Sequence, residues 1–142
     1  MTIKFYKTNE PYGFLNNFKK ARMFIYSKWW NNVETPYQSR KCSDPAEAIW
    51  IWESKTPREA RDRGQLVQMV SDWDKIKVGV MKQCVMAKFL QHADLRAQLI
   101  ATGDEELIEA SPVDSFWGQI NGVGQNNLGK VLMEVREAIK GE

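Results

Sequence analysis

Two segments of the 142-residue chain carry apolar side chains at the spacing of one helix face. Residues 71–91 have them at positions 73, 76, 80, 81, 84, 85 and 89, and residues 127–140 have them at positions 128, 131, 132, 135, 138 and 139. Steps of three and four residues bring side chains to one side of an α-helix. The pattern therefore predicts two amphipathic helices whose apolar faces lie in the core.

Shorter helices are predicted from their boundary residues. The segments "SDPAEAIWIWES" and "TPREARDRG" each open with a capping residue, a proline and a glutamate, namely Asp44, Pro45 and Glu47, then Thr56, Pro57 and Glu59. This order is typical of a capping box at a helix start. Gly64 is expected at the C′ position after the second helix. Another short helix is predicted over "ADLRAQLIA" and ends at Thr102-Gly103.

Strands are expected only near the N-terminus. "MTIKFY" alternates apolar Ile3 and Phe5 with polar neighbours, which indicates a short strand. "ARMFIYSKWW" is rich in β-branched and aromatic residues and predicts a second strand, which we expect to pair with the first. The sequence thus predicts one α+β domain over residues 1–142, predominantly helical, with a small N-terminal β-sheet.

The composition argues against several kinds of site. The chain has 20 Lys and Arg and 18 Asp and Glu, a net charge of +2, which does not by itself indicate nucleic acid binding. The single histidine, His92, argues against a histidine-based metal centre and against a Ser-His-Asp triad. Cys42 and Cys84 form no CxxC motif, so neither a disulfide framework nor a zinc site is expected. We therefore expect no metal and no cofactor.

The sequence contains no apolar run of about 18 residues and no signal-peptide pattern. We therefore expect a soluble cytoplasmic protein that does not contact a membrane. The helix faces are accounted for by an internal core, so a monomer is expected.

The stretch "ASPVDSFWGQINGVGQNNLG" (residues 110–129) allows two interpretations. In the first, Ser111 caps a helical turn, Asp114 completes a capping box with it, and Trp117 belongs to the core. In the second, Asp114 and Trp117 form a wall of a pocket, while the glycine-rich loop and the helix N-terminus near Asn126 receive a phosphate. The loop does not follow a predicted strand, so a Rossmann-type site is not expected.

A second polar stretch is "KWWNNVETPYQSRKC" (residues 28–42). Glu34, Tyr37, Gln38 and Lys41 are spaced i, i+3, i+4 and i+7, so a helix here presents all four on one face. That face is either solvated, as polar faces usually are, or the wall of a site.

Lys28 and Trp73 also have two interpretations. Lys28 stands beside two tryptophans and is either a surface lysine or a desolvated one, whose lowered pKa would make it a nucleophile or base. Trp73 is the first apolar residue of its predicted helix and belongs either to the core or to a site.

Nine motifs follow one another along the chain. They are "FY" (5–6), "YGFLNNF" (12–18), "KWW" (28–30), "ETPYQSRK" (34–41), "PREARDRGQ" (57–65), "WDKIKVGVMKQCVMAKF" (73–89), "LIATGDEELIEAS" (99–111), "DSFWG" (114–118) and "GQNNLGKVLMEVR" (124–136). In this order they resemble the NADAR family, also called YbiA-like proteins, over nearly the whole chain.

The resemblance implies a YbiA-like domain with N-glycosidase activity, which cleaves the bond between ribose C1′ and a base or arylamine nitrogen. Two substrate groups are associated with such proteins: small-molecule ribosylaminopyrimidine phosphates of riboflavin synthesis, and ADP-ribose attached to guanine in nucleic acid. Such a bond breaks through an oxocarbenium-like state, which needs a carboxylate near C1′ and an acid for the leaving group.

Carried over motif by motif, the resemblance gives Glu34, Asp114 and Lys28 as catalytic candidates and Trp73 and Trp117 as stacking residues. Further substrate-binding candidates are Asn17, Trp30, Tyr37, Gln38, Gly118 and Asn126. Attack by water and attack by Lys28 through a Schiff base both remain open.

Two departures from the family pattern bear on substrate preference. Thr35-Pro36 replaces the usual His-Tyr and is expected to reshape the start of the acid-bearing helix. Gln65 stands where the family usually has arginine, which removes an expected phosphate contact. One alternative is therefore a protein that binds ADP-ribose or a nucleotide without turnover. Another is a nucleic-acid-binding module that uses its tryptophans and the basic residues in 19–22 and 58–63.

Overall fold

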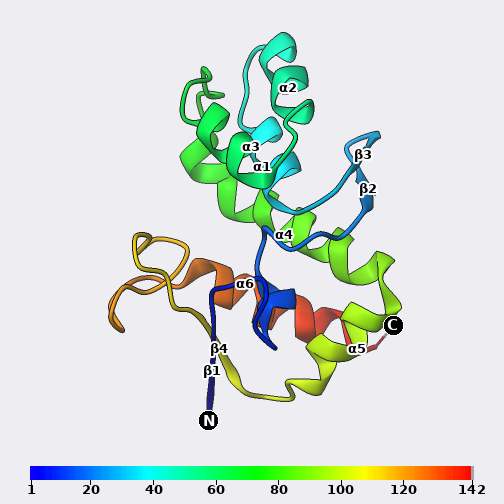
Figure 1. Cartoon of the computed structure of the whole chain (residues 1–142), viewed down its shortest axis with the longest axis vertical. Helices are drawn as coiled ribbons and strands as arrows, with labels where there is room; N and C mark the ends of the chain where they lie inside the picture. The colour runs from blue at the N-terminus through cyan, green and yellow to red at the C-terminus, as the bar shows by residue number, and fades with distance from the viewer. Residues whose placement is uncertain (142) are drawn as a thin grey trace.

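The fold is α+β and predominantly helical, as expected from the sequence, in a computed structural model that describes residues 1–141. The longest helix, α4 (Trp73–Gln91), crosses the molecule diagonally (Figure 1). Three short helices lie at its N-terminal end: α1 (Glu34–Arg40), α2 (Pro45–Trp52) and α3 (Pro57–Gly64). The other two, α5 (Ala93–Ala101) and α6 (Asn127–Ile139), lie toward the opposite end.

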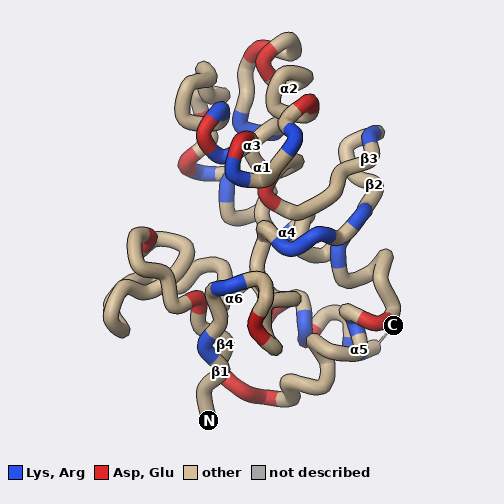
Figure 2. Tube along the Cα trace, in the orientation of Figure 1, with Lys and Arg blue, Asp and Glu red and all other residues tan. Residues whose placement is uncertain are grey.

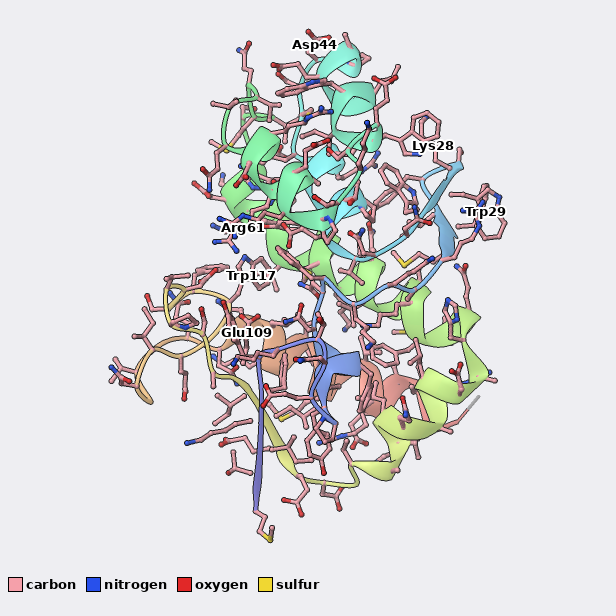
Figure 3. The ribbon with its side chains drawn as sticks, viewed as in Figure 1. Lys28, Trp29, Asp44, Arg61, Glu109 and Trp117 are labelled. Atoms are coloured by element: carbon pink, nitrogen blue, oxygen red, sulfur yellow. The ribbon has the colours of Figure 1, made fainter. Side chains whose placement is uncertain are left out.

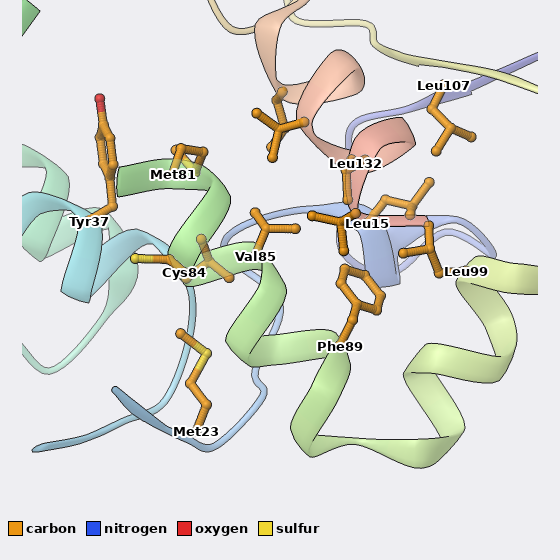
Figure 4. Close-up of a cluster of buried hydrophobic side chains, with 14 of the residues drawn as sticks. Leu15, Met23, Tyr37, Met81, Cys84, Val85, Phe89, Leu99, Leu107 and Leu132 are labelled. Carbon is orange, nitrogen blue, oxygen red and sulfur yellow. The ribbon is translucent and has the colours of Figure 1, made fainter. Parts of the chain in front are cut away.

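The two predicted apolar helix faces meet in the core (Figure 4). Most of the expected positions are buried: Trp73, Val80, Met81, Cys84, Val85 and Phe89 on α4, and Leu128, Val131, Leu132, Val135 and Ile139 on α6. Ile76 is only partly buried and Ala138 is exposed. Burial of this apolar surface is the main free-energy gain that holds the two helices together.

The short helices begin at their predicted capping residues. Asp44 accepts a hydrogen bond from the backbone N–H of Ala46, and Thr56 Oγ1 accepts one from the N–H of Glu59. The expected capping boxes are incomplete, because neither glutamate accepts a hydrogen bond from the backbone N–H of its capping residue. Glu47 instead accepts from the distant N–H of Gln68, and Glu59 accepts from the N–H of Lys55, one residue before the cap.

The expected pairing of residues 21–30 with the first strand is wrong. These residues form a hairpin of β2 (Met23–Ile25) and β3 (Lys28–Trp30), joined by Tyr26 and Ser27 at φ values of 54° and 63°. Two consecutive left-handed residues make the tight turn of a two-residue hairpin, so the two halves of this segment pair with each other. β1 (Thr2–Phe5) pairs instead in parallel with β4 (Glu106–Glu109), a strand that was not predicted.

No helix among residues 1–141 has the length and apolar character that crossing a membrane requires.

Candidate active site

A cavity of about 580 Å³ opens between the short helices and the C-terminal half of the chain. Its walls come from the N-terminal loop (residues 6–9 and 16–18), from α1, from the end of α3, and from residues 109–117. Arg61, Trp117 and Glu109 lie one below another on this side of the molecule (Figure 3). Segments far apart in the sequence therefore share one concave site, the usual arrangement of a ligand pocket.

The polar face of α1 points into this cavity. Glu34, Tyr37, Gln38 and Lys41 all line it, so the interpretation of a solvated helix face is wrong. The helix starts at Glu34 despite Pro36, because a proline in the first turn forfeits no intrahelical hydrogen bond.

Asn32 takes the capping role at the start of α1. Its Oδ1 accepts hydrogen bonds from the backbone N–H and the hydroxyl of Thr35, at 2.8 and 2.9 Å. The helix start that carries Thr35 and Pro36 is therefore capped, and Glu34 lines the cavity.

Glu34 is held from two sides. Its Oε2 accepts a hydrogen bond of 2.7 Å from Gln38 Nε2, and its backbone N–H donates to the carbonyl of Asn17 at 3.3 Å. Burial raises the pKa of the Glu34 carboxyl; the Gln38 hydrogen bond and the positive charge of Arg61 oppose this shift. The negative charge of Asp114 adds to the rise, which indicates that the two carboxylates share the site.

Asp114 fixes the turn that carries Trp117. Its Oδ1 accepts from the backbone N–H groups of Phe116 and Trp117, at 2.9 and 2.8 Å. Ser111 Oγ accepts from the N–H groups of Val113 and Asp114, as the capping interpretation expected. The capping box does not form, because the donors to Asp114 lie after it in the chain. Asp114 lines the cavity as well, so it both fixes this turn and forms part of the cavity wall with Trp117.

The aromatic wall is built from Tyr37 and Trp117. Their ring centroids are 5.5 Å apart at 89°, an edge-to-face contact, and both residues line the cavity. Trp73 is buried behind Tyr37, with ring centroids 5.2 Å apart, and lies in the core rather than on the cavity wall. Trp73 therefore supports the wall from behind.

A third carboxylate, Glu109, was missed by the sequence analysis. It ends β4 and lines the cavity with Glu34 and Asp114. Burial raises the pKa of Glu109 to about 7, and the charges of Asp114 and Glu34 act in the same direction. The sequence feature that could have indicated Glu109 is its place in the motif "LIEAS", where an acid follows two apolar residues.

Lys28 and Trp30 are not brought to this cavity. Both line a smaller hollow of about 290 Å³ between the hairpin and α2, and Figure 3 shows Lys28 far from Arg61 and Glu109. Lys28 Nζ lies 5.6 Å from the ring centroid of Trp52. Trp30 is buried and donates its indole N–H to the carbonyl of Ile25.

Gly118 and Asn126 have structural positions beside β4. A β-carbon on Gly118 would lie 2.5 Å from the carbonyl oxygen of Glu109, so this close approach requires glycine. Asn126, at φ 53°, accepts from the N–H of Glu109 and donates to the carbonyl of Leu107. Both residues hold the strand that presents Glu109.

The N-terminus of α6 does not offer the unpaired N–H groups that were expected to receive a phosphate. The backbone N–H groups of Asn127 and Leu128 donate to the carbonyls of Phe116 and Trp117, at 3.1 and 2.9 Å. Those carbonyls occupy the donors that an anion would need. The cavity instead draws its positive charge from side chains, namely Lys7, Lys41 and Arg61.

Charges of both signs are interspersed on the short helices, and on α3 basic and acidic residues alternate (Figure 2). This mixture is unlike the continuous basic surface of a nucleic-acid-binding module. Within residues 1–141, no group of three or more His, Cys, Asp or Glu side chains is arranged to hold a metal ion.

Comparison with known proteins agrees with this arrangement of motifs. An N-glycosidase of Nostoc punctiforme is 45% identical, over 99% of this chain and 94% of that protein. The N-glycosidase YbiA of Escherichia coli is 36% identical, over 96% of this chain and 88% of its own. The NMR structure of E. coli YbiA matches with a TM-score of 0.91 at 34% identity, over 98% of this chain and 84% of that one.

A riboflavin biosynthesis protein of Vibrio vulnificus is 38% identical, over 97% of this chain but only 38% of its own length. The NADAR domain itself matches residues 4–140. The chain therefore belongs to the NADAR domain family.

Proposed function

We propose that this protein is an N-glycosidase that hydrolyses the bond between ribose C1′ and a base or arylamine nitrogen. The observation that carries the proposal is the meeting of three carboxylates, Glu34, Glu109 and Asp114, in one cavity beside an aromatic wall. Relatives named as N-glycosidases, similar over almost their whole length, support it.

The three carboxylates have different tasks in this proposal. Their mutual repulsion favours a state in which one of them is protonated. Glu109, with a pKa of about 7, is suited to donate that proton to the leaving nitrogen. The carboxylate of Asp114 stabilises the positive charge that develops at C1′, and Glu34 accepts a proton from the attacking water.

The aromatic wall serves the leaving group. Trp117 and Tyr37 offer an apolar surface on which a pyrimidine or a guanine packs. Gln38 and the carbonyl of Asn17 hold Glu34 in place, so the base for water does not move during the reaction.

The substrate that we favour is a small ribosylaminopyrimidine phosphate. A relative named for riboflavin biosynthesis supports this choice. The other candidate is ADP-ribose attached to guanine, in which a ribose C1′–N bond is broken by the same chemistry.

The test is release of a reducing sugar by wild type and by Asp114→Asn, which keeps an oxygen for the Phe116 and Trp117 N–H groups. Wild type is expected to release sugar from the pyrimidine phosphate, and the variant is expected to lose at least about 100-fold in kcat. Guanine-ADP-ribosylated DNA is the second substrate. Binding of ADP-ribose without release from either substrate would instead indicate a non-catalytic binding protein.

A further inference from the structure

Arg61 is a cavity-lining cation whose side chain has no hydrogen-bond or ion-pair partner among residues 1–141. It lies on α3 and is exposed at the cavity, and within residues 1–141 it makes no side-chain hydrogen bond or ion pair. Arg63 on the same helix is different, because it donates to the carbonyl of Trp50 at 2.7 Å and pairs with Glu59 at 3.2 Å. Arg63 is therefore engaged in contacts within the protein, whereas the guanidinium of Arg61 is available to a ligand.

Other polar groups stand on the same wall of the cavity. Gln65 lines the cavity one helical turn after Arg61. Lys41 also lines it and donates from Nζ to the carbonyl of Gly64 at 2.7 Å, which ties α1 to the end of α3. Two cations and an amide thus meet where α1 and α3 adjoin.

Arg61 acts on the carboxylates without being paired to them. Its charge opposes the rise in the pKa of both Glu34 and Glu109, yet neither carboxylate lies within ion-pair distance of it. A negatively charged group bound at Arg61 would therefore lie near the reacting carboxylates without displacing either of them. This separation suits a substrate whose charged end is connected to its reacting carbon through a sugar.

We propose that Arg61, with Gln65 and Lys41, forms the subsite for the phosphoryl group on C5′ of the ribose that is cleaved at C1′. The inference rests on the proposed function, since both candidate substrates carry a phosphoryl oxygen on that C5′. A guanidinium offers two parallel N–H donors that match two phosphate oxygens, and an exposed arginine binds without first breaking an internal ion pair.

The test is calorimetric binding of ribose 5-phosphate to the intact protein, because this ligand has no bond to be cleaved. Arg61→Met is expected to weaken binding roughly 10- to 100-fold, the range for losing hydrogen bonds to a charged group. Arg58→Met is the matched control, since Arg58 is exposed on the same helix and does not line the cavity. Unphosphorylated ribose is expected to bind wild type and Arg61→Met equally.

A second variant distinguishes the loss of the Arg61 contact with phosphate from a disturbance of α3. Residues 61 and 65 share one face of α3, so the double variant Arg61→Met/Gln65→Arg returns a guanidinium to the same wall and is expected to recover most of the affinity. Equal affinity of wild type and Arg61→Met for ribose 5-phosphate would overturn the subsite. Inorganic phosphate that competes as well as ribose 5-phosphate would also overturn it, because the ribose would then make no contribution.

The two proposals fail in different ways. Loss of binding in Arg61→Met, without turnover of any substrate by wild type, would keep the subsite and remove the N-glycosidase. Turnover by wild type, with unchanged affinity of Arg61→Met for ribose 5-phosphate, would keep the N-glycosidase and remove the subsite. ADP-ribose distinguishes the source of the phosphoryl group: tighter binding of ribose 5-phosphate indicates a monoester substrate, and tighter binding of ADP-ribose indicates a diphosphate.

Discussion

The side chain of Gln38 occupies the space that a β-carbon on Gly64 would fill. A β-carbon built at Gly64 overlaps the Gln38 amide oxygen, and Gln38 donates from its other amide atom to Glu34. Gly64 is the last residue of α3 and is followed by a right-handed cap at Gln65, so its predicted role as a left-handed C′ residue is wrong. The glycine is needed for close packing that holds a catalytic candidate in place.

Gly64→Ala is therefore expected to lower activity while leaving the protein folded. The new methyl group must displace Gln38, which removes the hydrogen bond to Glu34. We expect a loss of roughly 10- to 100-fold in kcat, since a hydrogen bond to a charged group contributes about 1.5–3 kcal/mol. Steady-state kinetics and a thermal unfolding curve measure the two effects separately.

Gly79→Ala is the control for this substitution. Gly79 lies within α4, and a β-carbon there would meet no atom within 4 Å. Alanine at this position is expected to raise stability by up to about 1 kcal/mol and leave kcat unchanged. The effect of Gly64→Ala should also disappear in a Gln38→Ala background. Independent, additive losses would show that Gly64 acts by another route.

Glu109 is expected to produce the basic limb of the pH–rate profile. Its pKa of about 7 means that the proton needed by the leaving group is lost as the pH rises through 7. Activity of wild type should therefore fall above pH 7. Glu109→Gln should be slower at all pH values and should lack this limb.

A stability measurement tests the same pKa without relying on turnover. The folded pKa of about 7 lies above the ordinary value of 4.5, so the folded state binds more protons between these values. The contribution of Glu109 to the free energy of unfolding is therefore largest below pH 4.5 and is lost as the pH rises to 7. Glu109→Gln should lose this pH dependence, whereas Glu106→Gln, exposed on the same strand, should retain it.

The sequence predicted the parts of the fold and site that depend on local spacing. The apolar positions of α4 and α6 and the polar face of α1 all follow from a period near 3.6 residues, which one helix imposes by itself. Asp114 and Trp117 were found because they lie within one turn of each other, and the same hydrogen bonds that fix the turn hold both residues at the cavity.

The parts that were missed depend on contacts between distant segments. β4 has only four residues and its partner lies about a hundred positions earlier, so no local alternation identifies it. Glu109 was missed together with its strand. The aromatic neighbours of Lys28 in the sequence suggest a place in the site, but the turn at Tyr26-Ser27 directs the hairpin toward α2. Sequence proximity to tryptophan did not determine which cavity the lysine would face.

Lys28→Met is expected to leave kcat and KM unchanged, because Lys28 lies at the second hollow and contacts Trp52. Lys41→Met is the informative comparison, since Lys41 lines the main cavity and burial lowers its pKa. Borohydride reduction during turnover, followed by peptide mass analysis, provides a direct check on covalent chemistry. A sugar adduct on Lys28 would contradict the placement of the reaction in the main cavity.

Lys88 is expected to make stability rise with pH above neutrality. Its buried Nζ donates to the carbonyls of Phe14 and Asn16, at 2.5 and 3.2 Å, just before the cavity-lining Asn17. Burial lowers the pKa of Lys88 to about 7 from 10.5, with a smaller contribution from Lys19. Between these values the unfolded chain binds more protons, so the free energy of unfolding increases with pH, by on the order of 1 kcal/mol per unit.

Urea unfolding between pH 7 and 8 measures this slope below the range in which cysteines ionise in the unfolded chain, at about pH 8.5 and above. Lys88→Gln should lose the slope, because an amide retains two N–H donors for the same carbonyls but does not ionise. Lys75→Met is the control, since Lys75 is exposed on the same helix and should leave the slope as in wild type. An unchanged slope in Lys88→Gln would mean that Lys88 stays protonated throughout, with its charge stabilised by the two carbonyls despite its burial.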